Sequence, residues 1–305
     1  MALPNFLIVG AAKSGTTSLY HYLRQHPQVF MPEQIKETLF FCGLTARHFP
    51  GPGGHYADRA VETWEAYKQF FGDAGACIAR GEACVAYLYF HRASIARILE
   101  HLGRDVKIVI ALRNPVDRAY SNYLHHVRDG IEPLALEEAL ASAPQRQAEG
   151  WWWGFQYVDL GRYYEQVKAY WDTFGGEQIQ VLLYEELAAD TAGVVQRLFE
   201  FLEVEGTFRP HLSLRYNATG VPRHKRLHEL IVKPNPIKEA AKKVLPARLR
   251  GYLRTRYYQD YLVKPALSSK TRNRLAAAYR EDVLKLQALI QRDLSPWLGD
   301  PHEWR

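Results

Sequence analysis

The sequence predicts an α/β fold with three layers, in which a central parallel β-sheet lies between two layers of helices. Three apolar runs, at 6–9, 106–112 and 178–184, have the length and composition of buried parallel strands. Helical spacing of apolar residues follows each run, and this alternation favours a parallel sheet with its ligand at the carboxyl ends of the strands. The helices expected from the spacing are 16–23, 93–102, 116–127, 161–174, 185–202 and 270–294.

Length, composition and charge limit the classes of protein to which the chain can belong. Its 305 residues, 47% hydrophobic and 13% aromatic, are enough for one α/β domain with a smaller appendage. The net charge of +6 suits an anionic ligand, but it is too small to indicate nucleic-acid binding without a clustered basic patch. We therefore expect no nucleic-acid partner.

Cysteine usage and the absence of targeting signals predict the compartment. Cys42, Cys77 and Cys84 are unevenly spaced, form no metal-ligand pattern and indicate reduced thiols. The N-terminus has no charged region followed by an apolar core, and no apolar run approaches the roughly 20 residues that span a bilayer. These features predict a cytoplasmic protein without a metal site.

The segment FLIVGAAKSGTTSLYHYL, Phe6 to Leu23, joins the first strand to the first helix. Gly10 and Gly15 let the backbone fold closely around a ligand, and the first N–H groups of the helix point at an anion placed there. Lys13 adds a mobile positive charge. The loop is therefore predicted to hold phosphate, although a tight strand-to-helix turn with an exposed lysine is the alternative.

This loop differs from that of ordinary nucleotide triphosphatases, whose pattern is G-x-x-x-x-G-K-[ST]. Gly10 and Gly15 keep the glycine spacing, but Thr16 stands where that pattern has its lysine. Lys13 instead lies inside the loop, so it approaches a ligand from a different side.

AAKSGTTSL resembles the 5′-phosphosulfate loop of sulfotransferases that use 3′-phosphoadenosine 5′-phosphosulfate (PAPS), in the branch with bacterial, heparan-sulfate and tyrosylprotein enzymes. The resemblance implies a P-loop-like fold, a bacterial-type protein without the membrane anchor of Golgi relatives, and sulfuryl transfer that releases 3′-phosphoadenosine 5′-phosphate (PAP) without a metal. The cofactor-binding residues that it implies in this loop are Ala12, Lys13, Ser14, Gly15, Thr16 and Thr17.

A second segment, Glu37-Thr38-Leu39-Phe40-Phe41, matches the family's pattern of a catalytic glutamate, two residues and an aromatic pair. The resemblance implies that Glu37 takes the proton of the acceptor hydroxyl, with Lys13 as the catalytic cation. The adjacent Lys36 becomes a candidate for substrate contact. A surface Lys–Glu pair beside two core phenylalanines is the alternative.

A third segment, ALRNPVDRAYSNY, follows the strand 106–112. Arg113 and Ser121 match the family's 3′-phosphate site, an arginine at a strand end and a serine eight residues later. A guanidinium suits a terminal phosphate because two parallel N–H···O bonds fix its orientation. A solvated helix face explains His125 and His126 equally well, so neither is taken as a base.

Other substrate contacts are predicted from RGEACVAYLY and from three consecutive tryptophans. The family's Glu-Lys-[Ser/Thr]-Pro-x-Tyr motif keeps Glu82 but has Ala83 in place of its lysine, which makes Arg80 a candidate substitute. Aromatic faces bind sugar or lipid surfaces, and core packing is the equal alternative for such residues. The tryptophan candidates are Trp151, Trp152 and Trp153.

Basic residues concentrate toward the C-terminus. Relatives close a loop over the nucleotide at RYNATGVPRHKRL, so the predicted cofactor contacts here are Gly220, Arg223 and Lys225. The basic stretch 238–256 is interpreted as a lid, a peripheral membrane contact or a solvated face.

We thus expect one sulfotransferase domain over 1–305, with its core at about 1–212, a covering loop and basic lid at about 213–260, and a packing helix at about 270–294. The partners expected are PAPS and a hydroxyl acceptor, either a saccharide, a glycolipid or another small alcohol. Two alternatives stay open: a P-loop kinase that uses ATP and Mg²⁺, and a non-catalytic basic protein bound to membranes or nucleic acid.

Overall fold

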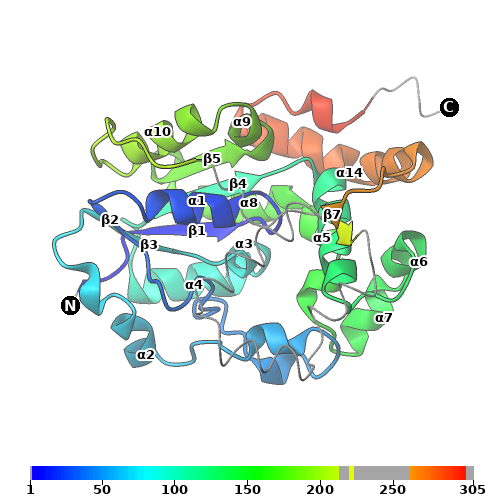
Figure 1. The fold of residues 1–305 in the computed structure, drawn as a ribbon, viewed down its shortest axis with the longest axis horizontal. Coiled ribbons are helices and arrows are strands. Elements are labelled where there is room, and N and C mark those ends of the chain that lie inside the picture. Colours follow the sequence, from blue (N-terminus) through cyan, green and yellow to red (C-terminus); the bar gives the residue numbers. More distant parts are fainter. Residues whose placement is uncertain (1, 213–219, 223–261, 300–305) are drawn as a thin grey trace.

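The computed structural model describes residues 2–212, 220–222 and 262–299. Its centre is a five-stranded sheet in the order β2-β3-β1-β4-β5 (Figure 1), and each pairing described in this sheet is parallel. The strands are β1 Phe6–Gly10, β2 Val29–Phe30, β3 Ala79–Ala83, β4 Lys107–Leu112 and β5 Ile179–Leu183. The predicted P-loop-like α/β architecture is confirmed.

Helices cover both faces of the sheet, which explains the uninterrupted apolar run in β1. On one face, Phe6 and Ile8 pack with α1 Thr16–Leu23 and α10 Thr191–Phe201. On the other face, Leu7 and Val9 belong to a core that includes residues of several further helices. Among these helices are α3 Ala86–Tyr89, α4 His91–His101, α8 Tyr163–Phe174 and α14 Ser269–Ile290.

The described remainder lies around this core. It comprises α2 Trp64–Gln69, α5 Pro115–Arg128, α6 Leu136–Ala141, α7 Ala143–Ala148, α9 Tyr184–Ala189 and the antiparallel pair β6 Val221–Pro222 and β7 Leu262–Val263. None of the helices in the described ranges is long and apolar enough to cross a membrane.

Two helix boundaries differ from the sequence prediction. The single helix expected at 185–202 is wrong, because Asp190 leaves helical geometry and its Oδ1 accepts the Gly193 N–H at 2.9 Å, capping α10. The last helix ends at Ile290 rather than near 294, because Gln291 adopts a left-handed conformation with φ 51°. The apolar stripe expected on this helix is buried: Leu275, Tyr279, Val283, Leu286 and Ile290.

Candidate functional site

A cavity of about 780 Å³ lies at the carboxyl edge of the sheet. Lys13 follows β1, Val85 follows β3, Arg113 follows β4 and Tyr184 follows β5, and all four line the cavity. The cavity therefore lies where parallel α/β sheets place their ligands.

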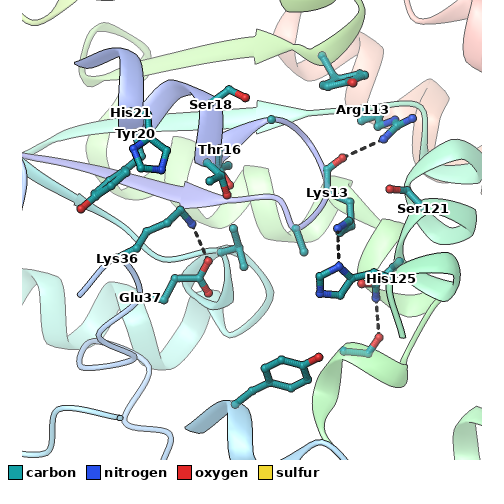
Figure 2. Close-up of a pocket in the computed structure, with 18 of the residues that line it drawn as sticks. Lys13, Thr16, Ser18, Tyr20, His21, Lys36, Glu37, Arg113, Ser121 and His125 are labelled. Carbon is teal, nitrogen blue, oxygen red and sulfur yellow. Dashed lines mark hydrogen bonds and ion pairs between the residues drawn. The ribbon is translucent and has the colours of Figure 1, made fainter. Parts of the chain in front are cut away.

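The loop between β1 and α1 forms one wall of the cavity (Figure 2). Gly15 has φ +88°, and a Cβ on it would lie 2.7 Å from Leu187 Cδ2, so this position requires glycine. The loop residues that line the cavity are Ala12, Lys13, Gly15, Thr16 and Thr17. Ser14 is the exception, because its side chain is buried away from the cavity and its Oγ has no hydrogen-bond partner among the residues that the structure describes.

Lys13 is held by two cavity-lining side chains. Its Nζ lies 3.1 Å from His125 Nδ1, and its carbonyl oxygen accepts a hydrogen bond of 3.1 Å from Arg113 Nη1. Burial and the nearby Arg128 lower the pKa of Lys13 to about 7. A lysine with this pKa gains a full positive charge when an anion binds beside it.

His125 has a defined protonation state in this arrangement. Burial and the charge of Lys13 keep its pKa well below the usual range, so the imidazole is neutral. Because Nδ1 faces the donors Lys13 Nζ and Arg128 Nη2, the ring proton belongs on Nε2, which lies 3.4 Å from Asp129 Oδ2.

Arg113 and Ser121 approach the cavity on the far side of Lys13 from Glu37 (Figure 2). Asn114 fixes this geometry, because its Oδ1 accepts the N–H groups of Val116 and Asp117 and so begins α5 directly after β4. The Arg113 guanidinium lies 4.4 Å from the centre of the Tyr184 ring.

Glu37 lies in an irregular segment on the opposite wall (Figure 2). Its Oε1 accepts a hydrogen bond of 2.6 Å from Lys36 Nζ, and both side chains line the cavity. Phe40 and Phe41 are fully buried and pack against Tyr67, so the aromatic pair anchors the segment.

Two substrate contacts predicted from the sequence around β3 lie outside the cavity. Arg80 lies at the amino end of β3 and donates to Leu3 O and Cys77 O, so the prediction that it replaces a catalytic cation is wrong. Glu82 is buried beneath the Glu37 segment and bonds to Tyr87.

The three tryptophans separate in the structure. Trp151 lies against Arg146 and donates to Glu149, outside the cavity, so its predicted contact is wrong. Trp152 and Trp153 do line the cavity. Their wall is tied to α5 by Asn122, whose Nδ2 donates to Gly154 O at 2.6 Å.

The predicted contacts near the C-terminus have separate outcomes. Gly220 is buried just before β6, which packs against α5, and it does not line the cavity. Arg223, Lys225 and the stretch 238–256 lie outside the described residues.

Several residues that line the cavity were not predicted from the sequence as contacts. His125 follows Ser121 by four positions and therefore shares its helix face, a signal that was available. His126 is 2% exposed, so a solvated helix face is wrong as the explanation of these histidines. Tyr56 lies in a short 3-10 helix, Gly54–Ala57, and its hydroxyl donates to Asp129 Oδ2 at 2.6 Å.

A family model described as "Sulfotransferase family" matches residues 4–209. The chain belongs to the sulfotransferase family. The crystal structure of a sulfotransferase from Alicyclobacillus acidocaldarius is 34% identical, covers 97% of this chain and 99% of that chain, and has a TM-score of 0.76. The family match and this structure confirm the resemblance to sulfotransferases that the three sequence motifs indicated.

Two mammalian proteins extend the comparison. The mouse bifunctional heparan sulfate N-deacetylase/N-sulfotransferase 4 is 25% identical over 307 residues, which cover 98% of this chain but 30% of that protein. This sulfotransferase therefore spans less than a third of that relative's length. A mouse sulfotransferase complexed with PAP has a TM-score of 0.50 at 12% identity, which is a likeness of fold alone.

Proposed function

We propose that this sulfotransferase transfers a sulfuryl group from PAPS to an acceptor hydroxyl, with Glu37 as the base. The observation that carries the proposal is the convergence of three chemistries on one cavity: the loop cation Lys13, the pair Arg113 and Ser121, and the carboxylate of Glu37. A glutamate within reach of a hydroxyl acts as a general base, and a cation beside a leaving phosphate stabilises its charge.

These cavity residues fit PAPS, which carries a phosphosulfate on the 5′ position and a phosphate on the 3′ position of its ribose. After burial, the charges of Arg128 and Arg113 lower the pKa of Lys13, while Asp129 and Glu37 raise it, so Lys13 lies beside two cations whose repulsion a bound anion would relieve. We propose that Lys13 and the N–H groups of 14–17 hold the phosphosulfate, while Arg113 and Ser121 hold the 3′-phosphate. These residues are called the donor half of the cavity.

In the proposed reaction, bound PAPS supplies the sulfuryl group. Glu37 takes the proton of the acceptor hydroxyl as an oxygen–sulfur bond forms and the bond from sulfur to the 5′-phosphate oxygen breaks. The electron pair stays on that phosphate oxygen, where Lys13 and the loop N–H groups stabilise the negative charge.

We propose that the acceptor is a carbohydrate, a glycolipid or a related alcohol. Tyr56, Trp152 and Trp153 line the cavity and offer aromatic surface, and Lys36 offers a hydrogen-bond donor beside Glu37. A relative named for heparan sulfate supports a carbohydrate. These residues and Glu37 are called the acceptor half.

Calorimetric titration with PAP in EDTA tests the proposal, with ADP and ATP as controls. We expect PAP to bind without metal and at least about 10-fold more tightly than ADP, because a charge-assisted contact to the 3′-phosphate contributes about 1.5–3 kcal/mol. Tighter binding of ATP that depends on Mg²⁺ would contradict the proposal and favour a kinase.

A further inference from the structure

Glu82 is a buried carboxylate that the proposed reaction does not use. It lies near the carboxyl end of β3, opposite Leu7 of the central strand β1, and is 1% exposed. Its Oε1 accepts a hydrogen bond of 2.7 Å from the Tyr87 hydroxyl, and the buried Tyr67 hydroxyl interacts with the same carboxyl group. Burying a carboxylate without a cation beside it destabilises a fold, so its hydrogen bond with Tyr87 calls for a functional explanation.

The bond from Tyr87 to Glu82 continues toward the cavity. The Tyr87 hydroxyl also lies 2.7 Å from Thr38 Oγ1. Because Tyr87 has one proton and gives it to Glu82, Thr38 is the donor in this second bond. Glu82, Tyr87 and Thr38 therefore form a directed chain of buried hydrogen bonds. Thr38 directly follows Glu37 and lies two residues before Phe40, the first of the aromatic anchors.

Backbone groups of the Glu37 segment bind to the same chain. The Phe41 N–H donates to the Tyr87 hydroxyl at 3.3 Å, and the Phe40 N–H donates to Thr38 Oγ1 at 3.2 Å. The Thr38 carbonyl accepts the Val61 N–H at 2.8 Å. Residues 31–45 contain no helix or strand, so these bonds replace the backbone ladder that would otherwise fix the segment.

We propose that Glu82, Tyr87 and Thr38 are positioning residues that hold Glu37 at its place on the acceptor half. The inference rests on the proposed role of Glu37 as the base. A displacement of about 1 Å at a reacting group can cost about 100-fold in rate, so loss of this support should lower kcat more than it weakens donor binding.

Matched variants test the chain. Thr38→Val removes the hydroxyl at nearly constant shape, and Thr38→Ser restores it. Tyr87→Phe removes the shared hydroxyl, and Tyr170→Phe is its control because Tyr170 is equally buried and donates to the Tyr87 carbonyl without reaching Thr38. Glu82→Gln keeps an acceptor oxygen for Tyr87.

The measurements are PAP release from PAPS, with water, methyl glucoside and 4-nitrophenol as acceptors, and PAP affinity by calorimetry. We expect Thr38→Val and Tyr87→Phe to lower kcat about 10- to 100-fold, with PAP affinity within about twofold of the parent. Thr38→Ser and Tyr170→Phe should stay within about threefold of the parent in kcat, because both keep the hydroxyls of Thr38 and Tyr87. Glu82→Gln should lower kcat less than Tyr87→Phe, because its amide oxygen still accepts the Tyr87 proton, and a larger loss than in Tyr87→Phe would contradict this role of Glu82.

Unchanged kcat in Thr38→Val and Tyr87→Phe would overturn the inference, as would an equal loss in Tyr170→Phe or a failure of Thr38→Ser to restore activity. If Tyr87→Phe does not fold, the two Thr38 variants decide alone. Glu37→Gln is measured in parallel: full turnover there removes the proposed base, whereas an inactive Glu37→Gln beside a fully active Thr38→Val removes the positioning chain only.

Discussion

The two halves of the cavity are built in different ways. In the donor half, Lys13 and Arg113 follow neighbouring strands, and Ser121 lies on a helix that begins directly after β4. In the acceptor half, Glu37 and Trp152 come from irregular segments held by side-chain contacts. The backbone topology therefore fixes the donor half, whereas packing and side-chain hydrogen bonds fix the acceptor half.

This difference predicts where substitution has separable effects. Donor-half residues should control affinity for PAP, and acceptor-half residues should control turnover. The prediction is wrong if substitutions in one half change PAP affinity and turnover equally.

The largest effect is expected for Glu37→Gln. The amide keeps the size of the side chain but cannot take a proton, so kcat should fall by about 10²- to 10⁴-fold, the usual contribution of a general base. PAP affinity, measured by calorimetry, should stay within about twofold of the parent. Near-normal turnover would show that Glu37 is not the base.

A smaller effect is expected for Arg113→Ala, which removes a donor-half guanidinium. PAP affinity should fall by about 10- to 100-fold, corresponding to the loss of a charged hydrogen bond of about 1.5–3 kcal/mol. Binding of ADP, which has no 3′-phosphate, should change much less. Arg80→Ala is the matched control, because Arg80 lies at the opposite end of the sheet, and an equal loss in that variant would refute the assignment.

The pH dependence of PAP binding isolates Lys13. Its pKa is about 7 in the free protein, and a bound phosphate raises it because the phosphate favours the charged amine. Affinity should therefore be highest below pH 7 and fall by up to about tenfold per pH unit above it, with proton uptake on binding.

Calorimetry in buffers of different ionisation enthalpy measures this uptake. Lys13→Arg is the control, because arginine stays charged over the whole range and should give a flat profile. Flat affinity between pH 7 and 9 in the parent chain, or proton release, would contradict the account of Lys13.

The smallest effect is expected outside both halves, at Asp190. Asp190→Ala removes the cap of α10 and should lower the free energy of unfolding by about 1 kcal/mol, while Asp190→Asn keeps the cap. Chemical denaturation measures the difference. Neither change should alter kcat or PAP affinity, so this pair is the control for a loss of stability that does not affect the site.

The sequence identified the residues of the proposed donor half as candidates because their signals are local. Strand, glycine loop and helix follow one another within the first 23 residues, and Arg113 and Ser121 lie on one strand-to-helix unit. Because β1 and β4 are neighbouring parallel strands, the sheet places the carboxyl ends of the β1–α1 and β4–α5 units side by side.

The acceptor half could be predicted only in part, because its residues take their places from long-range packing. Three consecutive tryptophans do not show which side faces the cavity, and the structure turns Trp151 toward Arg146. Arg80 was misplaced for a simpler reason: it lies in the amino-terminal part of β3, whereas the ligand lies at the carboxyl ends of the parallel strands. Asp190 was a visible capping signal inside the helix expected at 185–202.

Helix α5 connects the donor half to the acceptor half of the cavity. Ser121 faces the donor half, and the next residue, Asn122, holds the tryptophan wall through Gly154. Because both residues lie on one rigid helix, a shift of α5 moves the donor contact of Ser121 and the tryptophan wall together. If PAP moves α5, it must change the affinity for the acceptor, and the acceptor must change the affinity for PAP by the same factor.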